Sequence, residues 1–261
     1  MSPISIAYHD VVDDLRVARG IAQGHTTLYT IDRRMFREHL HAIAAMGTNA
    51  ELVPLEPSTP SQSNTVYLTV DDGAVSSYCV ADEMERLGWR GHFFVTTGWV
   101  GHPGFLDREQ VRDLVTRGHI VGSHSCTHPD RMSHLSGEQL AREWKDSCAM
   151  LADITGRSTV TASVPGGYYS RAVAEAAAEA GIRVLFTSEP TARQARVSSC
   201  FVLGRYSVRR THSAGTVARI AAGAVSPRAQ QAVGWFIKKS IRYAAGDYYL
   251  RLRTLLLARS H

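Results

Sequence analysis

The stretch VYLTVDDG, residues 66–73, runs from an apolar, β-rich segment directly into two carboxylates and a glycine. Three other β-rich runs also end in polar or turn-forming clusters, at residues 8–10, 123–128 and 165–168. Parallel α/β folds place their active sites at the carboxyl ends of the strands, in the loops that follow. We therefore expect these four clusters, which are far apart in the chain, to converge on one rim of a parallel sheet.

The rest of the chain alternates short β-rich runs with segments of helical period. The expected strands are Ile4–Tyr8, Val66–Val70, His92–Thr96, His119–Ser123, Val160–Val164, Arg183–Thr187 and a weaker one around Phe201–Val208. Helices are expected after a capping residue at Asp32, over Val80–Leu87, Asp107–Arg117 and Ser170–Ala180, and after a capping box formed by Ser136 and Gln139. About seven βα units of this kind predict a parallel sheet covered by helices, either open or closed into a barrel.

The composition is that of a soluble globular chain. With 261 residues, 44% of them hydrophobic and 20% charged, it excludes a collagen, a coiled coil and a fully disordered chain. No apolar run approaches the ~18 residues that span a bilayer, and the first residues lack the pattern of a secretory signal. The four cysteines are widely spaced without a CxxC pair, which suits reduced thiols. We therefore expect a cytoplasmic protein, either free or peripheral at the inner membrane face.

The net charge of +5 is concentrated at one end of the chain. Residues 227–261 hold seven basic residues and one acidic residue, a charge of +6, which leaves −1 for residues 1–226. A uniformly basic nucleic-acid binder is therefore disfavoured, and no nucleic-acid partner is expected. The division predicts a main domain over residues 1–226 and a basic helical tail over residues 227–261.

Within that tail, apolar residues recur at helical spacing beside Lys238, Lys239 and Arg242. A basic amphipathic helix of this kind can lie on an anionic membrane surface. It can equally pack its apolar stripe on the barrel or on another subunit. The sequence leaves both alternatives open.

The cluster at residues 123–128 contains the pair His124 and His128, whose spacing allows two imidazoles to share one metal ion. Taken alone, two surface histidines are the better explanation. Asp71 and Asp72 have a simple alternative as well, since Asp-Asp-Gly is a good solvated turn. Together, however, one aspartate and two histidines give three protein ligands and leave one position open, which is the arrangement of a catalytic zinc site.

Three of the clusters resemble the motifs of one family, the polysaccharide deacetylases (carbohydrate esterase family four, with a NodB homology domain). LTVDDG, residues 68–73, resembles the TFDDG motif; SHSCTH, residues 123–128, resembles H-[ST]-x-x-H; PGGY, residues 165–168, resembles the third motif. The similarity covers roughly residues 3–210. It implies a distorted (β/α) barrel of about seven parallel strands with surrounding helices, so that residues 1–226 would be the catalytic domain.

The resemblance also implies an activity. Members of the family remove N-acetyl groups from amino sugars, usually with zinc. The expected substrate is an N-acetylated amino sugar in an oligo- or polysaccharide, a lipid-linked sugar or a glycosylated small molecule. Position by position, Asp72, His124 and His128 would hold the divalent metal, with Zn²⁺ as the first choice, and Asp71 would be the catalytic base. Backbone N–H groups near Gly166 would stabilise the developing oxyanion.

Apart from Val70, which replaces the common Phe of the first motif and should alter packing only, the chain departs from the family pattern at two places. Ser163 stands where the third motif often begins with Arg, so we expect the base to lack its usual Arg contact. The late Leu-x-His motif that supplies the general acid is not evident either. His9 is our candidate for that acid, because Tyr-His at the end of the first strand resembles biofilm poly-N-acetylglucosamine deacetylases; the alternative is a structural histidine on the rim. Gly167 and Tyr168 complete the predicted substrate contacts, Tyr168 by stacking on a sugar face.

The two departures also support a second hypothesis. A catalytically weak sugar-binding or scaffold protein would keep the fold while the basic tail docks to a membrane. Acetate release from chitooligosaccharides, with and without added zinc, distinguishes this hypothesis from the enzyme.

Overall fold

Two parallel strands, β1 (Ile4–Tyr8) and β5 (Thr65–Val70), lie next to each other in the sheet and pair in register over the whole length of β1. In the computed structural model, which describes residues 3–13, 28–55 and 64–237, every residue of these two strands is buried. Strands of a parallel sheet that is covered on both faces have no solvent side. This is why the run at residues 66–70 shows no alternation of buried and exposed positions.

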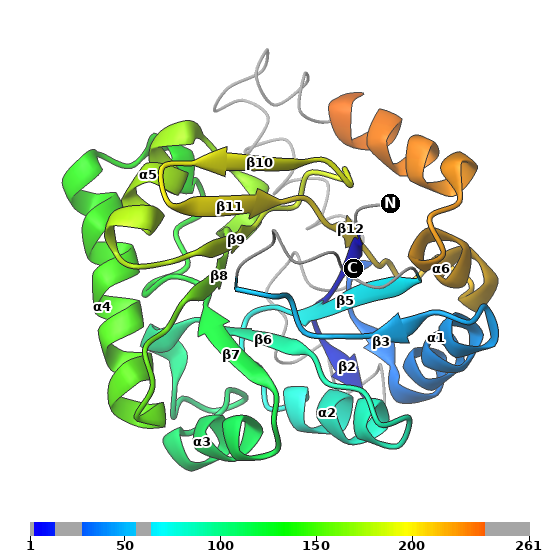
Figure 1. Ribbon diagram of the computed structural model, residues 1–261. Coiled ribbons are helices and arrows are strands. Elements are labelled where there is room, and N and C mark those ends of the chain that lie inside the picture. Colours follow the sequence, from blue (N-terminus) through cyan, green and yellow to red (C-terminus); the bar gives the residue numbers. More distant parts are fainter. Residues whose placement is uncertain (1–2, 14–27, 56–63, 238–261) are drawn as a thin grey trace, which may run out of the picture.

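The described residues form a ten-stranded sheet in the order β10-β11-β9-β8-β7-β6-β5-β1-β12, with β4 paired to β5. Its other strands are β4 (Asn49–Ala50), β6 (His92–Val95), β7 (Ile120–Ser123), β8 (Thr161–Ser163), β9 (Val184–Phe186), β10 (Gln194–Val197), β11 (Cys200–Leu203) and β12 (Tyr206–Ser207). All pairs are parallel except β10 with β11. The sheet curls into a half-barrel with helices on its outside (Figure 1). A separate pair joins β2 (Val11–Val12) to β3 (Ile31–Asp32).

The predicted fold class is confirmed, and one predicted strand is corrected. The segment around Phe201–Val208 is not a single strand, because the chain breaks after Leu203: β11 pairs with β9, and β12 crosses to β1. The break is at Gly204, where a Cβ atom would lie 2.5 Å from the backbone oxygen of Thr191. Only glycine, which has no Cβ atom, allows the two backbone segments to approach this closely.

The helices include two that begin at the residues their capping signals predict, behind Asp32 and Ser136, and one over residues 214–221 that the sequence did not predict. The helices are α1 (Arg33–Ala45), α2 (Ser77–Glu85), α3 (Arg108–Thr116), α4 (Gly137–Thr155), α5 (Arg171–Glu179) and α6 (Ala214–Ala221), with short 3₁₀ turns at Thr97–Trp99, Met132–His134 and Pro165–Gly167. The Asp32 side chain accepts a hydrogen bond from the N–H of Met35, and Ser136 forms a capping box with Gln139. These caps satisfy backbone N–H groups that the first turn of a helix leaves free.

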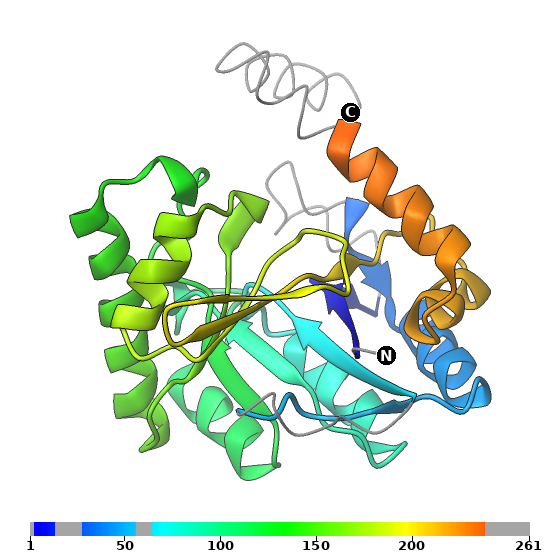
Figure 2. The same cartoon turned by 45° about the horizontal axis from the view of Figure 1, so that its top comes forward.

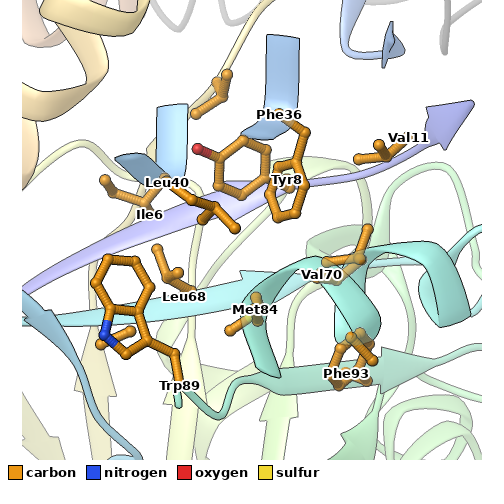
Figure 3. Packing of buried hydrophobic residues seen from close by; sticks show 14 of the residues in the cluster. Ile6, Tyr8, Val11, Phe36, Leu40, Leu68, Val70, Met84, Trp89 and Phe93 are labelled. Atoms are coloured by element: carbon orange, nitrogen blue, oxygen red, sulfur yellow. The ribbon is translucent and has the colours of Figure 1, made fainter. Parts of the chain in front are cut away.

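The largest apolar cluster lies between the centre of the sheet and the helices α1 and α2 (Figure 3). Tyr8 of β1 packs edge-on against Phe36 of α1 with ring centroids 4.9 Å apart. Leu68 and Val70 of β5 face the same cluster, and Met84 of α2 closes it. The ends of β1 and β5, where two of the polar clusters begin, are therefore anchored in the core.

A further helical stretch covers residues 225–237 and lies beside α6, drawn in orange (Figure 2). The rest of the predicted basic tail, residues 238–261, lies outside the described residues, and the division of the chain at residue 226 stays a prediction. Among the described residues, no helix has the length and the hydropathy needed to cross a membrane.

Candidate active site

Asp71 and Asp72 lie directly after β5, in a turn with left-handed backbone. Asp72 has a φ of 74° and Gly73 a φ of 78°. A Cβ atom at Gly73 would lie 3.2 Å from the Cα of Val95, so this turn needs a glycine for both its conformation and its space. The N–H of Asp71 donates to the carbonyl of Tyr8 at 3.1 Å, which ties the turn to the end of β1. The positions from which both carboxylates start are thus fixed by the sheet.

Asp72, His124 and His128 come together at this rim. The Nε2 atom of His124 lies 3.3 Å from Oδ1 of Asp72, and Nε2 of His128 lies 3.6 Å from the same oxygen. One ligand atom from each of the three residues lies within 4.8 Å of the other two. Asp72, Ser125 and His128 all have positive φ, as do only two other non-glycine residues of the described chain. Backbone strain of this kind collects at functional sites, where surrounding contacts hold it in place.

Glu143 of α4 holds the loop that carries the two histidines. Its carboxylate accepts hydrogen bonds from the backbone N–H groups of Cys126 and Thr127, both at 2.9 Å, and from Oγ1 of Thr127 at 2.6 Å. Within the loop, the N–H of His128 donates to Oγ of Ser125 at 3.0 Å. The loop conformation is therefore set by hydrogen bonds to a helix rather than by the chain's local preference.

Ser163, at the end of β8, orients the ring of His124. The Nδ1 atom of His124 lies 2.6 Å from Oγ of Ser163 and 3.1 Å from its backbone oxygen. The Ser163 hydroxyl donates to Oδ1 of Asp71 at 3.1 Å, so it can only accept from the histidine. Nδ1 of His124 then carries a hydrogen, so that Nε2, which faces Asp72, is the nitrogen that can bind a metal once it gives up its own proton.

Arg205 lies fully buried inside the half-barrel and contacts Asp71 through both guanidinium ends. Nη1 donates to Oδ1 of Asp71 at 2.6 Å, and Nη2 donates to Oδ2 at 2.8 Å. Two further hydrogen bonds fix the guanidinium, from Nη1 to Oγ1 of Thr69 at 2.9 Å and from Nε to the carbonyl of Thr187 at 3.1 Å. A two-pronged arginine–carboxylate pair of this geometry sets both the charge and the orientation of the carboxylate.

The expectation that Asp71 lacks an arginine contact is therefore wrong. Ser163 does stand at the position where the family often has Arg, but the guanidinium reaches Asp71 from the break between β11 and β12 instead. The sequence offers one signal for it: Arg205 is the only charged residue in the run CFVLGRYSV, residues 200–208. A lone charge in an apolar segment needs a buried partner.

The electrostatics of the site keep both aspartates ionised. Burial alone would raise the pKa of Asp71, but the charges of Arg205 and His124 outweigh it and hold that pKa well below its usual range. Burial would also raise the pKa of Asp72. The hydrogen bond from His124 and the charge of His9 outweigh this effect, so the pKa of Asp72 is lowered. The pKa of His128 is lowered by burial and by the nearby charge of His124, which favours a neutral imidazole.

His9 follows β1 and lies near the two aspartates. Its charge is among the causes that lower the pKa of both Asp71 and Asp72. The ring stacks on Tyr29 with centroids 4.9 Å apart. Its Nδ1 atom is buried without a hydrogen-bond partner among the described residues. The structure thus places His9 at the same rim as the aspartates, and its role as an acid stays a prediction.

Gly166, Gly167 and Tyr168 follow β8, three to five residues beyond Ser163, and therefore also lie at this end of the sheet. Both glycines have positive φ, 61° and 72°. The Tyr168 ring lies edge-on to His134 with centroids 6.4 Å apart. Their predicted contacts to an oxyanion and a sugar stay predictions.

The donor set at the three ligand residues fits a divalent transition metal. Two imidazole nitrogens and one carboxylate oxygen, with no fourth ligand in the cluster from the part of the chain that the structure describes, match the donor chemistry of catalytic zinc sites. The orientation of His124 by Ser163 supplies the supporting hydrogen bond that a ligating histidine needs. Beside these ligands stands an ionised carboxylate, Asp71, that is not one of them.

The family model that matches this chain and two of its curated relatives are described as deacetylases. Residues 58–185 match the family described as polysaccharide deacetylase. The putative polysaccharide deacetylase YxkH of Bacillus subtilis is 27% identical over 144 residues, which are 55% of this chain and 51% of that protein. The peptidoglycan-N-acetylmuramic acid deacetylase PdaA of the same organism is 28% identical over 131 residues, 49% of this chain and 48% of that protein. The chain thus spans about half the length of the curated relatives it matches.

Solved structures support the fold. The Streptococcus pyogenes deacetylase PplD, solved in complex with acetate, is similar with a TM-score of 0.70 at 19% identity, over 82% of this chain and 95% of that one. IcaB from Ammonifex degensii is similar with a TM-score of 0.64 at 22% identity, over 85% of this chain and 97% of that one. The metal-ligand candidates lie inside the region matched to the family, whereas His9 and Arg205 lie outside it.

Proposed function

Because residues 58–185 place this chain in the polysaccharide deacetylase family, we propose that it is a metal-dependent hydrolase that removes an N-acetyl group from an amino sugar. The observation that carries the proposal is the cluster of Asp72, His124 and His128 beside the separate, ionised carboxylate of Asp71. These three residues would hold a divalent cation, with zinc as the first choice. Such a cation would polarise the acetamide carbonyl and lower the pKa of the attacking water.

Asp71 is the base in this proposal. Hydrolysis breaks the bond between the acyl carbon and nitrogen, adds the oxygen of water to the carbon and returns a proton to the amine. Asp71 would take the proton of the water as it attacks. Arg205 and Ser163 support this role because they hold the carboxylate in one orientation and keep it ionised. The backbone N–H groups of Gly166 and Gly167 would stabilise the oxyanion.

His9 is the acid in this proposal, since an amine leaves poorly unless it is protonated. Its place beside the aspartates and its unpartnered Nδ1 support a group that exchanges a proton with a substrate. Tyr168 would stack on the face of the sugar. The substrate would be an oligo- or polysaccharide, a lipid-linked sugar or a glycosylated small molecule that carries an N-acetylamino sugar.

The alternative of a catalytically weak scaffold is not favoured. It was motivated in part by the absence of an arginine beside the base, and Arg205 supplies that contact.

Acetate release tests the proposed activity. We expect the full chain with zinc to release acetate from chitooligosaccharides or peptidoglycan fragments, and a chelator to abolish that release. Asp71→Asn is expected to lower kcat by about 10³-fold, because it removes the base but keeps the shape of the side chain. Wild-type turnover in Asp71→Asn, or unchanged turnover in the presence of the chelator, would show that another mechanism operates.

The role of His9 is tested by changing the leaving group. His9→Ala is expected to lower kcat by about 10²-fold on an N-acetylated sugar, whose amine needs a proton to leave. On 4-nitrophenyl acetate, whose leaving group needs none, the expected loss is less than about threefold. His41→Ala, at an exposed position of α1, is the matched control. Equal losses on both substrates would indicate that His9 is a structural rim residue.

A further inference from the structure

The helix over residues 225–237 has an unusual orientation: Arg228 and Gln231 face the barrel, whereas four of its five large apolar side chains are exposed. Gln231 donates from Nε2 to the carbonyl of Ser207 at 2.9 Å. Arg228 donates from Nη1 to the carbonyl of Gly223 at 3.1 Å and lies over the ring of Tyr206. Gln231 and Arg228 therefore lie on the inner face of the helix, where they contact β12 and the residues that follow α6.

The outer face carries an apolar stripe. Val225, Val233, Phe236 and Ile237 are 75%, 59%, 60% and 55% exposed, and the exposed Ala229 lies between them at helical spacing. We call these five residues the outer stripe. Half of the exposed large apolar side chains among the described residues lie on this one helix. A surface helix normally buries such a face, so a stripe that is left outward marks a surface for a partner.

The charge of the chain indicates which partner this surface fits. Lys238 and Lys239 follow Ile237 directly, and residues 227–261 carry +6 while residues 1–226 carry −1. A second copy bound face to face would bring two +6 segments together, which electrostatic repulsion disfavours. An anionic lipid surface offers the opposite charge together with an apolar layer at the depth that side chains such as Phe236 can reach.

We propose that the outer stripe is a membrane-docking surface that places the helix 225–237 in the interface of an anionic phospholipid bilayer. Of the alternatives that the sequence leaves open, packing of the stripe on the barrel does not hold for the described part of the tail, because its four large side chains are more than half exposed. Packing on another subunit is separated from membrane docking by the test below. Docking of this kind needs both components, because the apolar side chains supply the insertion and the basic residues the attraction to the lipid headgroups. It does not depend on the proposed deacetylase activity.

Co-sedimentation of the full chain with vesicles tests the proposal. We expect binding to vesicles of phosphatidylglycerol mixed with phosphatidylcholine, at least tenfold weaker binding to phosphatidylcholine alone, and weaker binding as salt rises. The double variant Val233→Ser/Phe236→Ser is expected to weaken binding at least tenfold. Lys238→Gln/Lys239→Gln is expected to weaken it about 30-fold, from about a factor of five per basic residue. Met46→Ser, at an exposed apolar position outside the stripe, is expected to bind like wild type.

Two results would overturn the proposal. One is a Val233→Ser/Phe236→Ser protein that keeps the wild-type circular dichroism spectrum and binds anionic vesicles as tightly as wild type. The other is sedimentation equilibrium that shows a wild-type dimer which the same double variant converts to monomers. The second result would assign the stripe to another copy of the chain.

Discussion

Arg205 controls the charge of Asp71 from a position 134 residues further along the chain. Its guanidinium satisfies both carboxylate oxygens and is itself held by Thr69 and Thr187. Sequence motifs found Asp71 and the metal-ligand candidates because each motif is contiguous. They could not find Arg205, since its contact depends on how the break between β11 and β12 turns the side chain into the half-barrel.

The substitution Arg205→Met tests this residue. Methionine has a similar length but no charge, so Asp71 would lose its partner while the three metal-ligand candidates stay in place. We expect a loss in kcat of about 10²-fold with little change in KM and with metal content retained. Removal of one partner from a buried ion pair also costs about 3–5 kcal/mol of stability, so the measurement is made well below the Tm.

Arg205→Lys is the matched variant for this experiment. Lysine keeps the charge but not the planar fork, so partial recovery of kcat is expected. Wild-type kcat in Arg205→Met would contradict a positioning role for the guanidinium.

The elements of the fold are predicted to different degrees. Helices with capping residues, such as α1 behind Asp32 and α4 behind Ser136, begin where the sequence indicates. Strands β1, β5 and β7 are predicted within one or two residues, because each is a short β-rich run that a polar cluster follows. The two-residue strands are too short to show an alternation of apolar and polar residues. The antiparallel β10 shows none either, since three of its four side chains are exposed.

One contact between elements was not predicted and bears on stability. Glu83 of α2 is buried and accepts hydrogen bonds from Arg33 at 2.8 Å and from Arg37 at 2.8 and 3.0 Å, both on α1. Arg86 lies 3.2 Å from the same carboxylate. The hydrogen bonds from Arg37, against the opposing effect of burial and with help from Arg33, lower the pKa of Glu83 to about 2. This carboxylate fastens α1 to α2.

The contact between Glu83 and the two arginines of α1 depends on pH. A carboxyl whose pKa falls on folding stabilises the protein above its ordinary pKa, and this stabilisation is lost as the pH falls from about 4.5 to about 2. We expect Glu83→Gln to destabilise the protein by about 2 kcal/mol at pH 7, which lowers the Tm by about 5 °C. The difference should shrink steadily below pH 4.5 in thermal unfolding curves.

Glu179→Gln, at an exposed position at the end of α5, is the control for Glu83. It is expected to change the Tm by less than about 1 °C, as surface substitutions usually do. A Glu83→Gln difference that is the same at pH 3 and pH 7 would show that the carboxylate charge is not the cause.

At the scale of the whole molecule, the strand ends bring together residues that the sequence separates. Asp72 after β5, His124 after β7 and Ser163 at the end of β8 lie within one network, as the rule for parallel sheets predicts. The predicted cytoplasmic location, the division at residue 226 and the sugar itself stay predictions.

The account depends most on one cation held by Asp72, His124 and His128. The direct measurement is metal stoichiometry by elemental analysis after dialysis of the full chain and its variants against zinc. We expect one zinc ion per chain in wild type and in Asp71→Asn, and less than about 0.1 in Asp72→Ala, His124→Ala and His128→Ala, because three-ligand sites lose affinity steeply when one ligand is removed. One zinc ion per chain in folded Asp72→Ala and His128→Ala would contradict the account, since the ion would then be bound elsewhere.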